Sequence, residues 1–126
     1  MFGDPRPPDV GIGGDHLEVI SHHDPPGTVV VRLAGELTIA TVDRFRLELD
    51  VTETSAVDVL ALDLREVTFI DSVALGAIIA AHKRAREVRR RLVVVTAGGA
   101  IARLLQVTRL DGSLEVAAEP PRARSA

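Results

Sequence analysis

The sequence predicts an α/β fold: a small mixed β-sheet of about five strands with three or four helices packed mainly on one face. Two observations carry this prediction. Runs rich in Val, Ile and Leu, typical of buried strands, alternate along the chain with segments whose apolar residues recur at helical spacing. The 126 residues suffice for one domain with a single core, and with three Phe and no Trp or Tyr this core must consist of Val, Leu, Ile and Ala.

Five segments have the composition of strands. Residues 28–33 form a β-branched run typical of a buried strand, and 57–64 are apolar at nearly every position, as expected in a sheet covered on both faces. The other three segments are 17–22, which is typical of an edge strand, 92–96 and 114–117.

Three segments predict helices. The first starts at Thr41 or Asp43, either of which can cap it, and continues to about residue 52. The third opens at 98–99, a Gly pair, and continues to about residue 107. The second spans Ser72 to about residue 90, and its predicted buried stripe at i, i+3, i+4 and i+7 spacing consists of Leu75, Ile78, Ile79, His82 and Ala85.

The predicted domain comprises residues 16–118, between flexible tails at 1–15 and 119–126. The tails are rich in Pro or Gly and have too few apolar residues to offset the entropy of ordering them. The chain has no cysteine, which excludes disulfides and thiol chemistry. It also has no apolar run of roughly 18 residues and no signal-peptide pattern, so the sequence predicts a cytoplasmic protein.

Asp71 and Ser72 stand at the start of the second predicted helix, directly after a predicted strand. Ser72 in the N-cap position would accept a hydrogen bond from a free N–H group of the first turn, and Asp71 would face the positive end of the helix dipole. The same position also suits a phosphorylation or docking site, because backbone donors at a helix start tolerate a phosphate. The residue pattern alone leaves both interpretations open.

Elsewhere the sequence gives no sign of catalysis, and no cofactor or metal is predicted. The four histidines have no acidic or histidine partner at metal-ligand spacing, and the Gly pair lacks the lysine of a phosphate-binding loop. The basic segment 83–91 suits the solvated C-terminal end of a helix. Direct nucleic-acid binding is not predicted, because the net charge is −3 and no aromatic residue interrupts that segment.

Four motifs lie along the predicted domain: Gly35-Glu36-Leu37, the strand LALDL, the stretch VTFIDSVALG and the later stretch LVVVTAGGAIARLLQVTRL. Together they resemble the STAS-domain anti-sigma factor antagonists, the anti-anti-sigma factors of bacterial partner-switching systems. The resemblance covers about residues 17–117 and is most specific from Phe69 to Gly76.

The resemblance implies a docking edge made by the loop 35–41, the helix start at Asp71 and Ser72, and the exposed side of the second helix. The predicted partner-binding residues are Gly35, Glu36, Leu37, Thr38, Asp71, Ser72, Val73, Ala74, Leu75 and Gly76. Glu36 is expected to be exposed there and to meet a basic partner. Gly35 is expected to supply a backbone angle that other residues resist.

Three positions of this chain depart from the pattern of the family, and the most modest departure is Ala74, where family members usually have Gly. A kinase-type anti-sigma factor phosphorylates the second hydroxyl residue of the family's Asp-Ser-Ser motif, and that position is Val73 here. Ser72 is then a possible displaced phosphorylation site. In addition, Thr38 stands where family members commonly have an Asp, so one charge is missing from the expected surface.

The resemblance implies a non-enzymatic antagonist that binds a kinase-type anti-sigma factor with a histidine-kinase-like ATPase fold and so releases a sigma factor. The usual phospho-switch is not expected, because Val73 has no hydroxyl group. The alternatives are a STAS subunit of another assembly, such as a stressosome-like scaffold or a lipid-transport accessory, or a module that binds a small ligand or nucleotide. The sequence does not predict an oligomeric state.

Overall fold

A computed structural model describes residues 16–24, 27–53, 56–108 and 114–121. The predicted tail 1–15 and most of the predicted tail 119–126 lie outside these residues. The elements in chain order are β1 (Leu17–Asp24), β2 (Thr28–Leu37), α1 (Val42–Glu53), β3 (Val59–Ile70), α2 (Ser72–Glu87), β4 (Arg91–Val95), α3 (Gly99–Thr108) and β5 (Glu115–Ala117).

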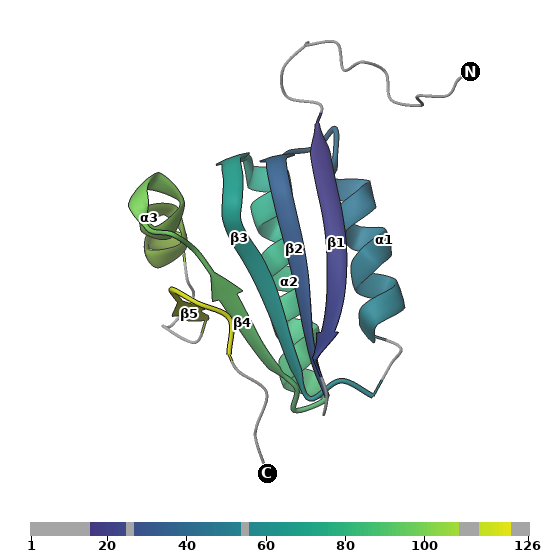
Figure 1. Ribbon diagram of the computed structural model, residues 1–126. Coiled ribbons are helices and arrows are strands. Elements are labelled where there is room, and N and C mark those ends of the chain that lie inside the picture. Colours follow the sequence, from purple (N-terminus) through teal and green to yellow (C-terminus); the bar gives the residue numbers. More distant parts are fainter. Residues whose placement is uncertain (1–15, 25–26, 54–55, 109–113, 122–126) are drawn as a thin grey trace, which may run out of the picture.

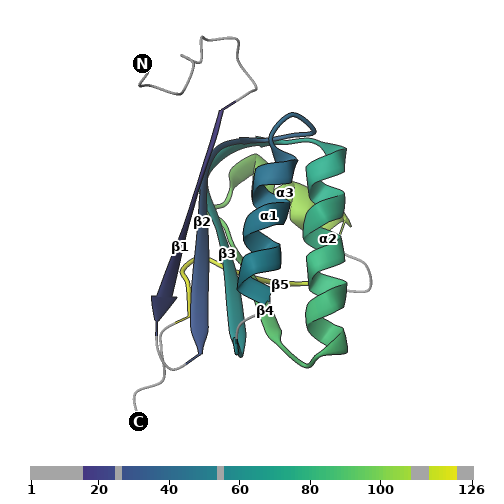
Figure 2. The same ribbon diagram turned by 90° about the vertical axis from the view of Figure 1, so that its right-hand side faces the viewer.

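The five strands form one sheet in the order β1-β2-β3-β4-β5. β1 is antiparallel to β2, whereas the pairs β2–β3, β3–β4 and β4–β5 are parallel. Each parallel connection passes through a helix, as parallel neighbours require. α1 and α2 lie side by side on one face of the sheet, and α3 lies beyond β4, near the upper part of β3 in the first view (Figures 1 and 2). The predicted mixed α/β fold is confirmed.

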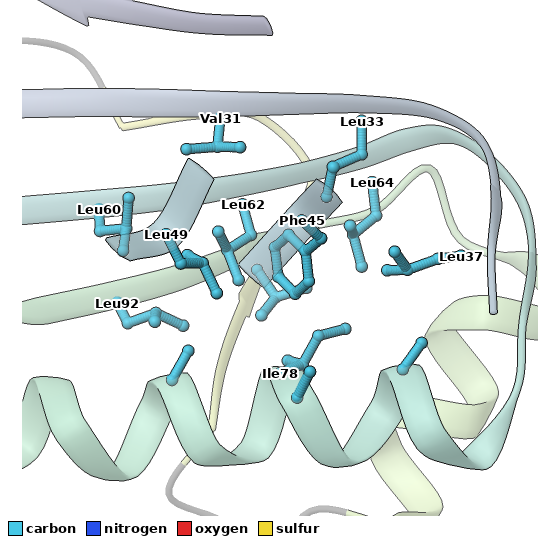
Figure 3. Packing of buried hydrophobic residues seen from close by; sticks show 14 of the residues in the cluster. Val31, Leu33, Leu37, Phe45, Leu49, Leu60, Leu62, Leu64, Ile78 and Leu92 are labelled. Atoms are coloured by element: carbon cyan, nitrogen blue, oxygen red, sulfur yellow. The ribbon is translucent and has the colours of Figure 1, made fainter. Parts of the chain in front are cut away.

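The main core lies between the sheet and helices α1 and α2 (Figure 3). Phe45 and Leu49 of α1 and Ile78 of α2 are almost fully buried, because each lies on the side of its helix that faces the sheet. Alternate residues of the strands meet them from the sheet, among them Val31, Leu33, Leu60, Leu62 and Leu64. As predicted, one Phe and many aliphatic side chains make up this core.

The opposite face of the sheet carries a small apolar cluster and charged side chains. The cluster comprises Val30, Ala61, Val93 and Val95. Asp63 of β3 is buried there although it is charged, because Arg65 donates hydrogen bonds to it from its backbone N, at 3.1 Å, and from Nε and an Nη, at 2.9 and 2.8 Å. In β3, therefore, the residues on this second face include the buried Ala61 and the charged Asp63, which pairs with Arg65.

Three strands are longer and one helix is shorter than the sequence predicts. β1 continues to Asp24. β2 continues to Leu37 and β3 to Ile70, and the added residues pair with one another through two register shifts. Helix α2 ends at Glu87 because Arg89 takes a left-handed backbone angle (φ 59°) and the N–H of Arg90 returns to the carbonyl of Ala85 at 2.8 Å.

Candidate functional site

The two segments of the predicted docking edge meet at one end of the sheet. In the paired extensions of β2 and β3, Glu36 lies opposite Phe69 and Leu37 opposite Ile70. Directly beyond them β2 leads into the turn before α1, and β3 leads into α2 (Figure 1, upper end of the sheet). The fold thus brings 35–38 and 71–76 together, although more than thirty residues separate them in the chain.

Asp71, and not Ser72, caps helix α2. Its backbone is extended (φ −97°, ψ 178°), and its Oδ1 accepts a hydrogen bond from the N–H of Ala74 at 2.9 Å. The prediction of Ser72 as N-cap is therefore wrong: Ser72 is the first helical residue and its side chain is exposed. This arrangement leaves the Ser72 hydroxyl outside the capping bond.

The same carboxylate also joins the two segments of the edge. Asp71 Oδ2 accepts a hydrogen bond from the N–H of Ile39 at 2.8 Å, and the N–H of Asp71 donates to the carbonyl of Leu37 at 3.2 Å. Both carboxylate oxygens are thus engaged by backbone donors, one from each segment. Asp71 fixes the turn between β2 and α1 against the start of α2.

Threonine side chains hold that turn in place. Thr41 Oγ1 accepts from the N–H of Thr38 at 3.0 Å and donates to the carbonyl of Glu36 at 2.8 Å. Thr38 Oγ1 in turn accepts from the N–H of Ala40 at 3.1 Å. Thr41 directly precedes α1, as predicted. Its hydroxyl group bonds to Glu36 and Thr38 and so stabilises the turn before the helix. Thr38 is buried, so the residue that replaces the family's Asp presents no group to a partner.

Gly35 has the backbone angle that the sequence predicts for it, but within β2 and not in a turn. Its φ is +118°, and an added Cβ would lie 2.4 Å from the backbone oxygen of His16. That oxygen accepts a hydrogen bond from the N–H of Glu36 at 2.9 Å, so the close approach belongs to the pairing of the two strands. Gly35 is required here for its conformation and for its lack of a side chain.

Glu36 is less exposed than predicted. The residue is partly buried, and its Oε1 atom is enclosed with no hydrogen-bond partner. The expectation of a freely exposed carboxylate is therefore wrong, because the extension of β2 places Glu36 in the sheet, opposite Phe69, instead of in an open loop.

Four of the ten predicted partner-binding residues are buried: Leu37, Thr38, Ala74 and Leu75. Val73 is partly buried and packs against the main core, while Ser72 and Gly76 are exposed. An added Cβ at Gly76 would meet no atom within 4 Å, so the outer side of α2 is open at this point. Helical spacing accounts for this division, because adjacent helix positions face different sides, and it had already placed Leu75 on the predicted buried stripe.

Two large apolar side chains are exposed at the same edge. Ile39 is 69% exposed in the turn that Asp71 holds, and Phe69 is 53% exposed two residues before Asp71. Ile39 lies within the predicted docking loop 35–41, but the sequence singled out neither residue for binding, because single exposed apolar residues are common on protein surfaces. The signal that could have identified them is their position next to the two motif segments.

Hydrogen bonding lowers the pKa of Asp71 from its ordinary value, with the backbone N–H of Ala74 as the largest cause and that of Ile39 as a further one. A carboxyl group whose pKa is lower in the folded than in the unfolded state stabilises the fold above the unfolded pKa, and this contribution disappears as the pH falls through the folded pKa. The connection between the two segments should therefore weaken in acid.

We expect Asp71→Asn to be less stable than the wild type near neutral pH, because the amide NH₂ group would face one of the two N–H donors. The difference between the two proteins should shrink as the pH falls from about 7 to about 3, since the wild-type carboxylate then becomes protonated. Urea unfolding of both proteins across this range measures it. Asp63, whose pKa is also lowered, is present in both proteins, so its contribution cancels in the stability difference between them. A stability difference that does not change with pH would contradict this role of the Asp71 charge.

The described residues contain no cluster of three or more His, Asp or Glu side chains able to hold a metal ion. Among the same residues, no helix has both the length and the apolar character needed to cross a membrane.

The fold and the motif at its edge define a class of protein. The chain matches the STAS domain family over residues 20–123, and it belongs to that family. Among its relatives is the anti-sigma-B factor antagonist of Listeria monocytogenes, which is 31% identical over 84 residues, 67% of this chain and 74% of the relative. The anti-sigma F factor antagonist of Paenibacillus polymyxa is 29% identical over 92 residues, 72% of this chain and 77% of that protein.

Solved structures show the same fold. An anti-sigma factor antagonist from Mycobacterium paratuberculosis superposes with a TM-score of 0.75 at 24% identity, covering 83% of this chain and 88% of the other. The Bacillus cell fate determinant SpoIIAA in its phosphorylated form superposes with a TM-score of 0.64 at 21% identity, covering 81% of this chain and 93% of the other. The predicted STAS family and fold are thereby confirmed.

Proposed function

We propose that this chain is an anti-sigma factor antagonist that binds an anti-sigma factor and so releases a sigma factor. The observation that carries the proposal is the similarity over two thirds of the chain to proteins named as anti-sigma-B and anti-sigma F factor antagonists. The proposal assigns no enzymatic activity to the chain and places its action in the cytoplasm, where bacterial transcription occurs.

The proposed docking edge is the end of the sheet where the turn 38–41 meets the start of α2. Asp71 supports this assignment, because it ties the two segments into one surface through both carboxylate oxygens. The outer side of α2 continues that surface with Ser72, Gly76 and Ala80, which are exposed and spaced four residues apart. Their small side chains would let the backbone of a partner approach closely.

We propose a kinase-type anti-sigma factor with a histidine-kinase-like ATPase fold as the partner. The usual phosphate switch would not operate at the family's acceptor position, because Val73 offers no oxygen to phosphorylate. The chain would then act constitutively or be controlled by its abundance. Ser72 remains the alternative acceptor, and it is exposed and free of the capping role that Asp71 performs.

The test is incubation of the purified protein with each kinase-type anti-sigma factor encoded in the same genome, together with ATP. We expect a stable complex with one of them and no phosphate on the chain by mass spectrometry. Val73→Ser should gain a phosphate at residue 73, because it restores the acceptor, and should then dissociate from the partner.

Two controls make the outcome specific. Ser72→Ala should bind like the wild type if Ser72 is not an acceptor. Phosphate on wild-type Ser72 that is lost in Ser72→Ala would show that the switch has moved by one residue. Absence of any complex with every anti-sigma factor tested would contradict the proposed function itself.

A further inference from the structure

We propose that the anti-sigma factor is held at the docking edge mainly by apolar contacts, with Ile39 and Phe69 as the two anchors. The inference rests on the proposed function, since it concerns the same partner. It adds the chemistry of the contact: an apolar patch on the partner that covers both side chains, instead of a basic surface that meets carboxylates.

The exposure of the two side chains is the first argument. Ile39 and Phe69 are 69% and 53% exposed, although Thr38, before Ile39, and Ile70, after Phe69, are buried. Covering such side chains would stabilise a complex, because the burial of apolar area is the main favourable contribution to most associations. Aromatic residues are also enriched among the side chains that contribute most to binding.

The hydrogen bonds of Asp71 bring the backbone segments that carry the two anchors together at one end of the sheet. The N–H of Ile39 donates to Asp71 Oδ2 at 2.8 Å, and Phe69 precedes Asp71 by two residues at the end of β3. The backbone beneath Ile39 is thus fixed relative to the end of the strand that carries Phe69. The backbone of this turn therefore needs little further ordering when a partner binds, and this lowers the entropic cost of forming the complex.

The carboxylates of the two segments are engaged or partly enclosed, which is the second argument. Both Asp71 oxygens accept backbone hydrogen bonds, and one Glu36 carboxylate oxygen is enclosed. Thr38, which replaces the family's Asp, is buried. The exposed charges at the start of α1 have both signs, since Asp43 pairs with Arg46 at 3.4 Å and Arg44 lies between them, so they give the edge no net acidic character that would attract a basic partner.

The experiment measures the affinity for the anti-sigma factor identified above with three variants. Ile39→Ser and Phe69→Ser should each weaken the complex by about tenfold or more. Ile20→Ser is the matched control: this isoleucine is 59% exposed on β1, away from the edge, and its replacement should leave the affinity within about twofold. Thermal unfolding identifies any variant that fails to fold, and Ile39→Ser, in a turn, carries the test if Phe69→Ser does not fold.

The salt dependence of the wild-type complex is the second readout. An apolar contact predicts that the association rate and affinity change little between low and high ionic strength, whereas charge-steered docking slows steeply as salt is added. Wild-type affinity in both anchor variants, or a steep salt dependence, would overturn the inference and leave the proposed function intact. Absence of any wild-type complex would overturn both.

Discussion

Replacing Ile78 with alanine should lower the free energy of unfolding by about 2–5 kcal/mol, the range measured for large-to-small changes in protein cores. Ile78 is fully buried near the centre of α2, where it points into the core beside the sheet and α1 (Figure 3). Removal of three carbons there loses apolar burial and leaves a cavity, and the surrounding aliphatic side chains come from several elements, so they cannot easily close it. Chemical denaturation monitored by circular dichroism measures the effect.

Ile79→Ala is the matched comparison. The sequence places Ile79 on the same buried stripe as Ile78, but in the structure Ile79 is only partly buried and packs at the margin of the core. Its replacement should therefore cost clearly less. Equal losses for the two variants would mean that the face of α2 that points to the sheet is assigned wrongly.

The fold was predictable because its signals are local and repeated. β-Branched runs such as 28–33 indicate strands, and the spacing of Leu75, Ile78 and Ala85 indicates a helix, whatever the rest of the chain does. The number of strands and the positions of the helices between them then allow few topologies. The mixed five-stranded sheet follows from this pattern.

The extensions of β2 and β3 were not predictable from local patterns. Residues 34–37 and 65–70 contain Gly, Glu, Arg and Thr, which break the apolar run, and they become strands only because they pair with each other through two register shifts. This pairing depends on tertiary structure. As a consequence, the sequence suggested an open loop at Glu36 where the protein has a paired strand.

The choice between Asp71 and Ser72 as N-cap shows the same limit. Both residue types are good N-caps, so propensity does not distinguish them. In the structure Asp71 has a second acceptor oxygen, which reaches the N–H of Ile39 thirty-two residues earlier in the chain, and a serine cannot bridge in this way with one hydroxyl group. A long-range hydrogen bond, from the N–H of Ile39 to Asp71, therefore favours Asp71 as the N-cap of α2.

Arg90 is a further example. It belongs to a basic segment that the sequence assigns to a solvated helix end, but its Nε donates to the carbonyl of Val57 at 2.9 Å. The side chain thus satisfies a backbone acceptor just before β3. A solvated arginine and an arginine that bonds to a distant carbonyl group look the same in a basic segment. The composition of the segment therefore could not reveal the bond from Arg90 to Val57.

Gly35→Ala should destabilise the protein by about 2–6 kcal/mol, since backbone strain and steric overlap each cost roughly 1–3 kcal/mol. Gly35 has a φ of +118°, outside the range that L-residues readily adopt, and an added Cβ would lie 2.4 Å from the backbone oxygen of His16. A flexible side chain could move away, but this oxygen is held by the hydrogen bond from the N–H of Glu36. Relief of the overlap would require the separation of β1 from β2.

Gly76→Ala is the control for this prediction, because it makes the same chemical change at the same edge. Gly76 lies inside α2 at an open position, where an added Cβ meets no atom within 4 Å. Alanine there should keep the stability or raise it by up to about 1 kcal/mol, the difference in helix propensity. Urea unfolding of both variants separates the two effects. If Gly35→Ala is as stable as the wild type, the backbone at this point adopts another angle, and the close pairing of β1 with the end of β2, on which the docking edge rests, is not formed as described.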